Sequence, residues 1–227
     1  MARVASFHLV RARRAATALS HLALDRRHLR RVDGLDVWRL LGTGRGADTG
    51  PSADLHRTAL FAVWHDEGDL DAFLGASPVV ERWSGAEESW HVRLRGISGH
   101  GSWRGADVLT GLQRGAADGP IAVLTRADVR WRSSRAFRAA GRAVSGELLR
   151  APGMLAAAGV GERPVGRLGT FSLWSDLEAM TAFAARPRHL DAVRRTRAGG
   201  WYGEELFARF EPYASSGTWD GRDPLGP

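Results

Sequence analysis

The residue best placed to do chemistry in this chain is His189, in the segment PRHLDAVRR. Pro187 is well suited to the first position of a helix, so the segment predicts a helix that begins there. His189 would lie in its first turn, where the positive end of the helix dipole disfavours a protonated imidazole. A neutral imidazole keeps a lone pair that can bind a metal ion. We therefore predict His189 as a metal ligand, with a surface histidine at a helix start as the alternative.

A long internal repeat singles out this histidine. The stretch RTALFAVWHDEGDLDAF recurs as RLGTFSLWSDLEAMTAF, and Trp174 follows Trp64 at an offset of 174 − 64 = 110 residues. At that offset His189 is matched by Val79, or by Val80 if the prolines before the two segments are aligned. One copy therefore has an apolar side chain where the other has an imidazole, and this broken symmetry points to function in the second copy.

Small side chains near the predicted helix leave space for a bound group. The strand predicted at 154–160 carries Ala156, Ala157 and Ala158. The first copy has larger residues in its second strand: Val37, Trp38, Leu40 and Leu41. Protein interiors are densely packed, so such room is normally filled. A planar macrocycle between sheet and helices, held by one histidine, would fill it.

The neighbours of His189 define the predicted binding site. Leu190 and Val193 mark the expected buried stripe of the helix, and His189 lies one turn from Val193. A side chain at the edge of this stripe can point into the gap between helix and sheet. We assign cofactor binding to His189, Val193, Ala156 and Ala158, with His189 as the metal ligand.

Two arginines within predicted strands of the second copy are candidate catalytic residues. Arg126 and Arg209 each lie in a strand, and an arginine beside a buried iron can stabilise a bound oxygen species. The alternative is a structural ion pair with Glu205, Glu211 or Asp128.

Other kinds of site are disfavoured by composition. The chain has no cysteine, and all 32 of its basic residues are arginine. Thiol nucleophiles, Schiff bases and lysine-containing phosphate loops are therefore excluded. No two histidines have the H-x-x-x-H spacing of a zinc helix. His8 faces Val4 and Val10 in a predicted strand, which indicates a core histidine.

The charge balance bears on partners and location. The net charge is +7, but the arginines are mixed with 25 acidic residues and accompany no nucleic-acid motif. We expect no nucleic-acid partner. The helix predicted at 12–31 has apolar positions at Ala16, Leu19, Leu22 and Leu24 and a dense arginine face. This basic face is expected to be solvated, with docking on an anionic membrane as the alternative. No signal peptide or stretch of about 20 apolar residues is present, so we expect a cytoplasmic protein, with membrane association left open.

Each half of the chain reads as strand, helix, strand, strand, helix, strand. The strands are predicted at 2–11, 35–41, 57–65 and 88–97, and again at 121–130, 154–160, 168–175 and 204–213. A single helix is predicted at 67–83, after the third strand. This order predicts an α+β protein of two fused ferredoxin-like repeats, paired as in a dimeric α+β barrel. We place the N-terminal repeat at 1–110 and the C-terminal repeat, with the cofactor site, at 111–227.

Glycine-rich segments complete the predicted organisation. The segment 98–120 is expected to be a linker, and GTGRG at 42–46 a turn. A phosphate-binding loop is the alternative for GTGRG, but such a loop needs a helix that starts within the glycines. The tail SSGTWDGRDPL repeats HGSWRGADVL, so that Trp219 matches Trp103.

These residues resemble the spheroidene monooxygenase family, bacterial enzymes that put keto groups on carotenoids. The resemblance spans nearly the whole chain. Its motifs are VWRLLGTGRG, LFAVWHDE, AEESWHVRL, PIAVLTRA, GVGERP, TFSLWSDLEAMTAFA, GWYGEELFARF and the SGTW tail. It implies a haem-dependent oxygenase with a fold akin to haem-binding dimeric α+β barrels. In those relatives the proximal histidine lies on a helix of the C-terminal half, which is where His189 stands.

The combined prediction is a protein that binds haem b, with iron held by His189. We expect it to activate oxygen or peroxide and to oxidise a hydrophobic small molecule, such as a carotenoid or a related biosynthetic intermediate. An electron-donor protein and self-association are further possible partners. The alternatives are a haem-dependent lyase or dehydratase acting on N–O or N–N bonds, and a non-catalytic haem-binding protein.

Overall fold

The computed structural model describes residues 2–44, 46, 53–162 and 167–226, without the side chains of residues 138, 142 and 143. The strands of the first half are β1 (Val4–Arg11), β2 (Leu35–Gly44), β3 (Ala53–Trp64) and β4 (Glu88–Gly101). Those of the second half are β5 (Ile121–Val129), β6 (Met154–Gly161), β7 (Arg167–Trp174) and β8 (Tyr202–Gly217). The helices are α1 (Ala15–Leu29), α2 (Glu67–Ala76), α3 (Pro78–Trp83), α4 (Ser134–Leu148), α5 (Leu177–Ala184) and α6 (Pro187–Ala198), with a 3₁₀ turn at Trp131–Ser133.

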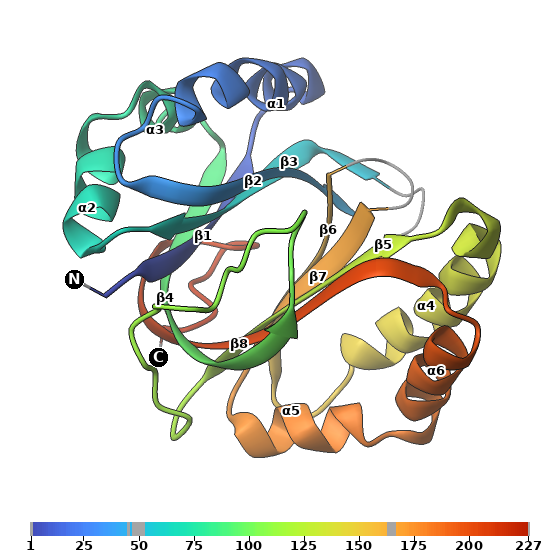
Figure 1. Cartoon of the computed structure of the whole chain (residues 1–227). Helices are drawn as coiled ribbons and strands as arrows, with labels where there is room; N and C mark the ends of the chain where they lie inside the picture. The colour runs from blue at the N-terminus through green and yellow to red at the C-terminus, as the bar shows by residue number, and fades with distance from the viewer. Residues whose placement is uncertain (1, 45, 47–52, 163–166, 227) are drawn as a thin grey trace.

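The described strands form one closed antiparallel barrel in the order β1-β3-β2-β6-β7-β5-β8-β4. Within each half the order is fourth, first, third, second strand, as in a ferredoxin-like sheet. The two sheets join through a long β4–β8 ladder and a short β2–β6 seam, where Gly42 pairs with Gly161 and Thr43 with Val160. Figure 1 shows the helices outside the barrel, α1 to α3 over one half and α4 to α6 over the other. The predicted fold class is confirmed.

Alternation along β1 separates the two sides of the barrel wall. Phe7 points into the barrel and stacks on Phe171 of the other half, with ring centroids 3.9 Å apart. Val4 and Val10 point outward and pack beneath the helices of the first half. Successive strand residues face opposite sides of a sheet, so each strand serves both the barrel core and a helix-covered layer.

The predicted linker at 98–120 is wrong in part, because it contributes to the barrel core. Strand β4 runs on to Gly101, and Trp103 is buried against Phe61 with ring centroids 5.7 Å apart. The C-terminal tail also contributes to the core: Trp219 is buried, and its ring centroid lies 5.4 Å from that of Trp90. The predicted match of Trp103 with Trp219 is confirmed, and both close the barrel core.

A carboxylate from the opposite repeat holds each of these turns. Glu204 accepts hydrogen bonds from the backbone N–H groups of Arg104 (2.9 Å) and Gly105 (2.8 Å). Glu88 accepts one from the backbone N–H of Gly221 at 2.7 Å. These bonds tie the two repeats together near the barrel ends.

Helix α1 is rotated relative to the prediction. Apolar positions were expected at Ala16, Leu19, Leu22 and Leu24, whereas the buried positions are Ala18, His21, Asp25 and Leu29. The reason is an ion pair: buried Asp25 binds Arg82 of α3, which turns this polar face inward and leaves Leu19 51% exposed. Charged groups are buried only with such partners.

The helices after β3 and β7 confirm the repeat. Asp66 and Asp176 each begin a helix and accept a hydrogen bond from the backbone N–H three residues on, at 3.0 and 2.7 Å. The single helix predicted at 67–83 is divided at Ser77, whose hydroxyl caps α3.

The segment GTGRG is only partly the predicted turn, since Gly42 to Gly44 form the end of β2. Residues 45 and 47–52 lie outside the described residues. Within the described residues, no helix has the length and apolar character needed to cross a bilayer.

Candidate functional site

A cavity of about 190 Å³ lies between the sheet of the second half and helices α4 and α6. Its sheet side includes Thr125 and Thr170, and its α6 side includes His189 and Val193. Small residues of α4, such as Gly141, line the remaining side. The structure therefore brings His189 and Val193 together in one hollow, on the helix-covered face of the C-terminal repeat.

His189 is held in a defined tautomer. Its Nδ1 lies 3.0 Å from the carbonyl oxygen of Ala184, at the end of α5. A carbonyl oxygen only accepts, so Nδ1 carries the proton and Nε2 keeps its lone pair. Nε2 has no hydrogen-bond partner among the described residues. Burial lowers the pKa of His189 below its ordinary value, although the bond to Ala184 acts in the opposite direction. The imidazole is thus neutral at physiological pH and able to bind a metal ion.

The equivalent place in the first half is filled. Val79 is fully buried there, in a layer that also contains Leu70 and Phe73. In the second half the ring of Phe183, the counterpart of Phe73, lies 5.3 Å from the ring of His189. The same framework therefore packs tightly in one copy and leaves a histidine-bearing cavity in the other.

Two paired threonines on the sheet side of the cavity were not predicted from the sequence. Thr125 of β5 and Thr170 of β7 are direct cross-strand partners and both line the cavity. Neither hydroxyl has a hydrogen-bond partner within the part of the chain that the structure describes. Alternation alone indicates which face each threonine takes, but only the β5–β7 register shows that they are neighbours.

Val193 lines the cavity as predicted, but two other expectations for this region differ. Leu190 was expected in the buried stripe of α6 and is instead 39% exposed, because the side of α6 that faces the cavity carries His189, Val193 and Thr196. Arg209 does not line the cavity. Its guanidinium lies over the ring of Phe207, 5.0 Å from the ring centroid.

The alanines of β6 lie apart from His189. Ala158 and, more loosely, Ala156 pack against the core inside the barrel, whereas Ala157 faces the helix-covered layer. A register irregularity between Met154 and Ala156 places Leu155 and Ala156 in the same core. Neither Ala156 nor Ala158 lines the cavity. The small side chains of these two residues therefore adjoin the core inside the barrel and not His189.

Arg126 borders the cavity, but its charge is engaged elsewhere. Alternation directs its side chain to the opposite face of β5 from Thr125. There the guanidinium, 2% exposed, binds Glu204 and lies 3.5 Å from Asp128. Asp128 is one of the ion-pair partners that the sequence offered as the alternative. Hydrogen bonds outweigh burial and lower the pKa of Glu204 to about 2, so this carboxylate stays charged.

Two neighbouring histidines lie in the first half: His8, which is buried, and His91, which is partly buried. His8 Nδ1 and His91 Nδ1 are 3.0 Å apart, and His8 Nε2 lies 2.8 Å from Ser6 Oγ. Burial and the neighbouring His91 lower the pKa of His8 well below its ordinary value, and burial lowers that of His91 to about 4. His8 is a satisfied core residue, as predicted. Among the described residues no three or more histidine, aspartate or glutamate side chains gather as a metal site.

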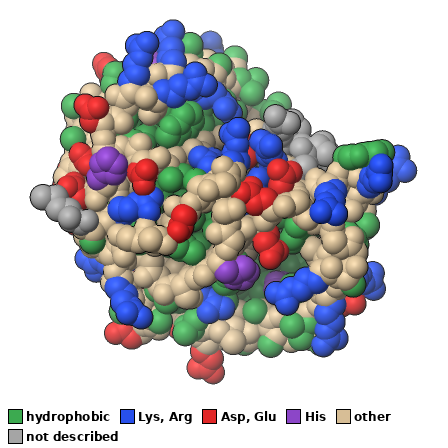
Figure 2. All heavy atoms as spheres, in the orientation of Figure 1, with side chains coloured by type: hydrophobic (Ala, Val, Ile, Leu, Met, Phe, Trp, Pro, Cys, Tyr) green, Lys and Arg blue, Asp and Glu red, His purple; other side chains and the backbone are tan. Residues whose placement is uncertain are grey.

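Basic side chains cover the helices on both sides of the barrel. Figure 2 shows them over α1 at the top and near α4 and α6 at the right. Arg26 and Arg27 lie in the last turn of α1, where they favourably face the negative end of the helix dipole.

Comparison with curated proteins identifies two close relatives. The chain is 35% identical over 192 residues to the spheroidene monooxygenase of Cereibacter sphaeroides, covering 83% of this chain and 59% of that protein. It is 31% identical over 211 residues to the spheroidene monooxygenase of Rhodobacter capsulatus, covering 91% of this chain and 88% of that protein. The chain thus spans less than two thirds of the Cereibacter relative's length. No family model matches the chain.

Among solved structures, an aldoxime dehydratase in complex with butyraldoxime has a similar fold. The TM-score is 0.62 at 13% identity, and the match covers 93% of this chain and 79% of that one. At this identity the likeness concerns the fold alone.

Proposed function

Since the chain belongs to the spheroidene monooxygenase family, we propose that it is a haem-dependent monooxygenase acting on a hydrophobic, carotenoid-like molecule at the His189 cavity. The observation that carries the proposal is the Nε2 atom of His189, which is unpaired among the described residues and belongs to a ring whose other nitrogen is held by Ala184. Relatives that bear the name of such an enzyme support the reaction class.

The chemistry of the residues at the cavity supports a haem. A flat ring needs an axial nitrogen on one side and small or apolar neighbours around it, and the cavity offers His189, Gly141 and Val193. When bound, haem supplies the redox chemistry that activates oxygen or peroxide. His189 would hold its iron through Nε2.

Other residues at the cavity would orient the His189 ring and a bound polar group. The bond from His189 Nδ1–H to Ala184 fixes the ring and raises the basicity of the ligand nitrogen, as hydrogen bonds behind metal ligands generally do. Thr125 and Thr170 offer two hydroxyls on the sheet side, which can donate to a polar group bound in the cavity. Val193 and Leu148 give the cavity wall apolar surface.

The test is the absorption spectrum of purified protein before and after addition of haem, for wild type and His189→Ala. We expect a Soret band that this substitution abolishes or shifts. The matched control is His65→Ala, since that histidine is exposed and follows β3 in the first half of the chain. A Soret band that is identical in wild type and His189→Ala would overturn the assignment of the ligand.

A second measurement addresses the reaction. Oxygen consumption that depends on a carotenoid such as spheroidene is expected for a monooxygenase. Turnover without oxygen consumption would instead support the lyase or dehydratase alternative.

A further inference from the structure

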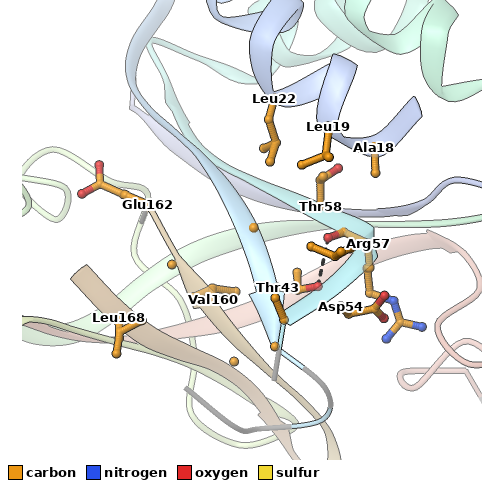
Figure 3. Close-up of a pocket in the computed structure, with 16 residues that line it drawn as sticks. Ala18, Leu19, Leu22, Thr43, Asp54, Arg57, Thr58, Val160, Glu162 and Leu168 are labelled. Atoms are coloured by element: carbon orange, nitrogen blue, oxygen red, sulfur yellow. Dashed lines mark hydrogen bonds between the residues drawn. The ribbon is translucent and has the colours of Figure 1, made fainter. Parts of the chain in front are cut away.

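An apolar groove of about 190 Å³ lies outside the barrel, between α1 and the seam that joins the two halves. Figure 3 shows Leu19 and Leu22 reaching towards it from α1, and Val160 and Leu168 forming its wall on β6 and β7. The groove is therefore built from both repeats, at the place where β2 meets β6.

A missing side chain keeps this groove open. Gly42 of β2 faces it, because Leu41 next to it points into the barrel core. A Cβ added at Gly42 would meet its nearest neighbour, the carbonyl oxygen of Gly161, at 3.9 Å, which is ordinary contact. Its φ angle is not positive, so the backbone does not require glycine. The glycine leaves room in the groove rather than relieving strain.

The charged and polar groups along the groove have partners within the protein. The Glu162 carboxylate lies 3.9 Å from Arg167 and 4.0 Å from Arg126, although its Oε2 accepts no hydrogen bond among the described residues. Thr43 Oγ1 donates to the carbonyl oxygen of Arg57 at 3.0 Å. The Arg57 guanidinium binds Asp220 and lies 3.4 Å from Glu88. Leu19, by contrast, exposes half of its apolar surface there. The groove thus favours an occupant with an apolar surface and no charge.

The groove adjoins the cavity of His189. Leu168, buried on β7, lines both hollows and pairs with Gly161 across the β6–β7 ladder. Leu168 is thus the side chain that a long molecule with one end beside His189 would cross to reach the groove.

We infer that the groove holds the hydrocarbon arm of an elongated, uncharged substrate whose reacting end lies in the His189 cavity. This inference rests on the proposed function for the reacting end. A single hydrocarbon chain is the fitting occupant, because 16 of the residues that the structure describes line the groove. A stable interface with a second copy of the chain takes roughly 20–30 residues on each side.

The test uses two variants and an uncharged linear triene, 1,6-diphenylhexatriene, whose fluorescence rises in apolar surroundings. Gly42→Leu fills the groove, and Leu19→Asp puts a charge on its exposed wall without disturbing the core. For each we expect the dissociation constant of the probe to rise at least about tenfold. Gly75→Leu is the matched control, since a Cβ at Gly75 meets nothing within 4 Å and that helix lies away from the groove.

Turnover of spheroidene by the haem-loaded protein gives a second readout. Both variants are expected to raise KM about tenfold or more, with haem uptake unchanged. Probe affinity and KM equal to wild type in both variants would overturn the inference while leaving the haem site intact. Groove-dependent probe binding by a protein that takes up no haem would instead overturn the proposed function and keep the groove as a binding site. Variants that change only liposome binding or dimerisation would overturn the hydrocarbon arm as occupant.

Discussion

His189 donates its Nδ1 proton to the carbonyl oxygen of Ala184 across 3.0 Å, and this bond determines which ring nitrogen is free for a ligand. Two consecutive helices make it possible: α5 ends at Ala184, and Pro187 starts α6 so that the imidazole turns back to that end. The first repeat has the same pair of helices, but Val79 occupies the corresponding place.

Placing a histidine in the first repeat is expected not to create a second site. Val79→His would bury an imidazole in a filled apolar layer, at a cost of about 1–3 kcal/mol in the free energy of unfolding. Urea unfolding measures this loss, and haem titration should still give one haem per chain. Two haems per chain would show that the histidine alone, and not the cavity, makes the site.

The paired threonines are expected to affect turnover and not cofactor binding. Thr125→Val and Thr170→Val keep the side-chain shape but remove the hydroxyl, so each should lower kcat about tenfold or more if it donates to the reacting group. The Soret band should remain. Thr110→Val, on an exposed loop, is the matched control. Unchanged kcat in both cavity variants would limit these residues to a packing role.

Glu204 is expected to stabilise the protein above pH 4.5. Its folded-state pKa of about 2 lies below its ordinary value of 4.5, so its stabilisation is present above the unfolded pKa and is lost as the pH falls from about 4.5 to 2. Glu204→Gln should lower the free energy of unfolding at pH 7 by about 1.5–3 kcal/mol. The same substitution should also make the free energy of unfolding fall less steeply between about pH 4.5 and 2. Glu205→Gln, a half-exposed neighbour, should do neither.

The neighbouring histidines His8 and His91 are expected to make the protein lose stability in a pH range above that of Glu204. Both pKa values are lowered by folding, so the stabilisation is complete above the ordinary value of 6.5 and is lost as the pH falls towards about 4. Melting temperatures measured between pH 7 and 4 should fall for wild type and fall less for His91→Phe. An equal fall in both proteins would assign the pH dependence to other groups.

The sequence by itself determined the repeated framework and the position of the histidine. Alternation in β1 placed His8 on the same face as Val4 and Val10, since the faces of a strand follow from its geometry within a few residues. The matched pair Asp66 and Asp176 indicated equivalent helix starts for the same local reason. Pro187 placed His189 in the first turn of a helix.

Only the tertiary structure decided what surrounds that histidine. The pairing of Thr125 with Thr170 depends on the register of strands 45 residues apart in sequence (170 − 125 = 45). The exposure of Leu19 follows from an ion pair between Asp25 and Arg82 on different helices. The local sequence pattern determines which face of its own helix or strand a residue occupies. Packing between elements sets helix rotation and strand register, and these decide which side chains share a cavity.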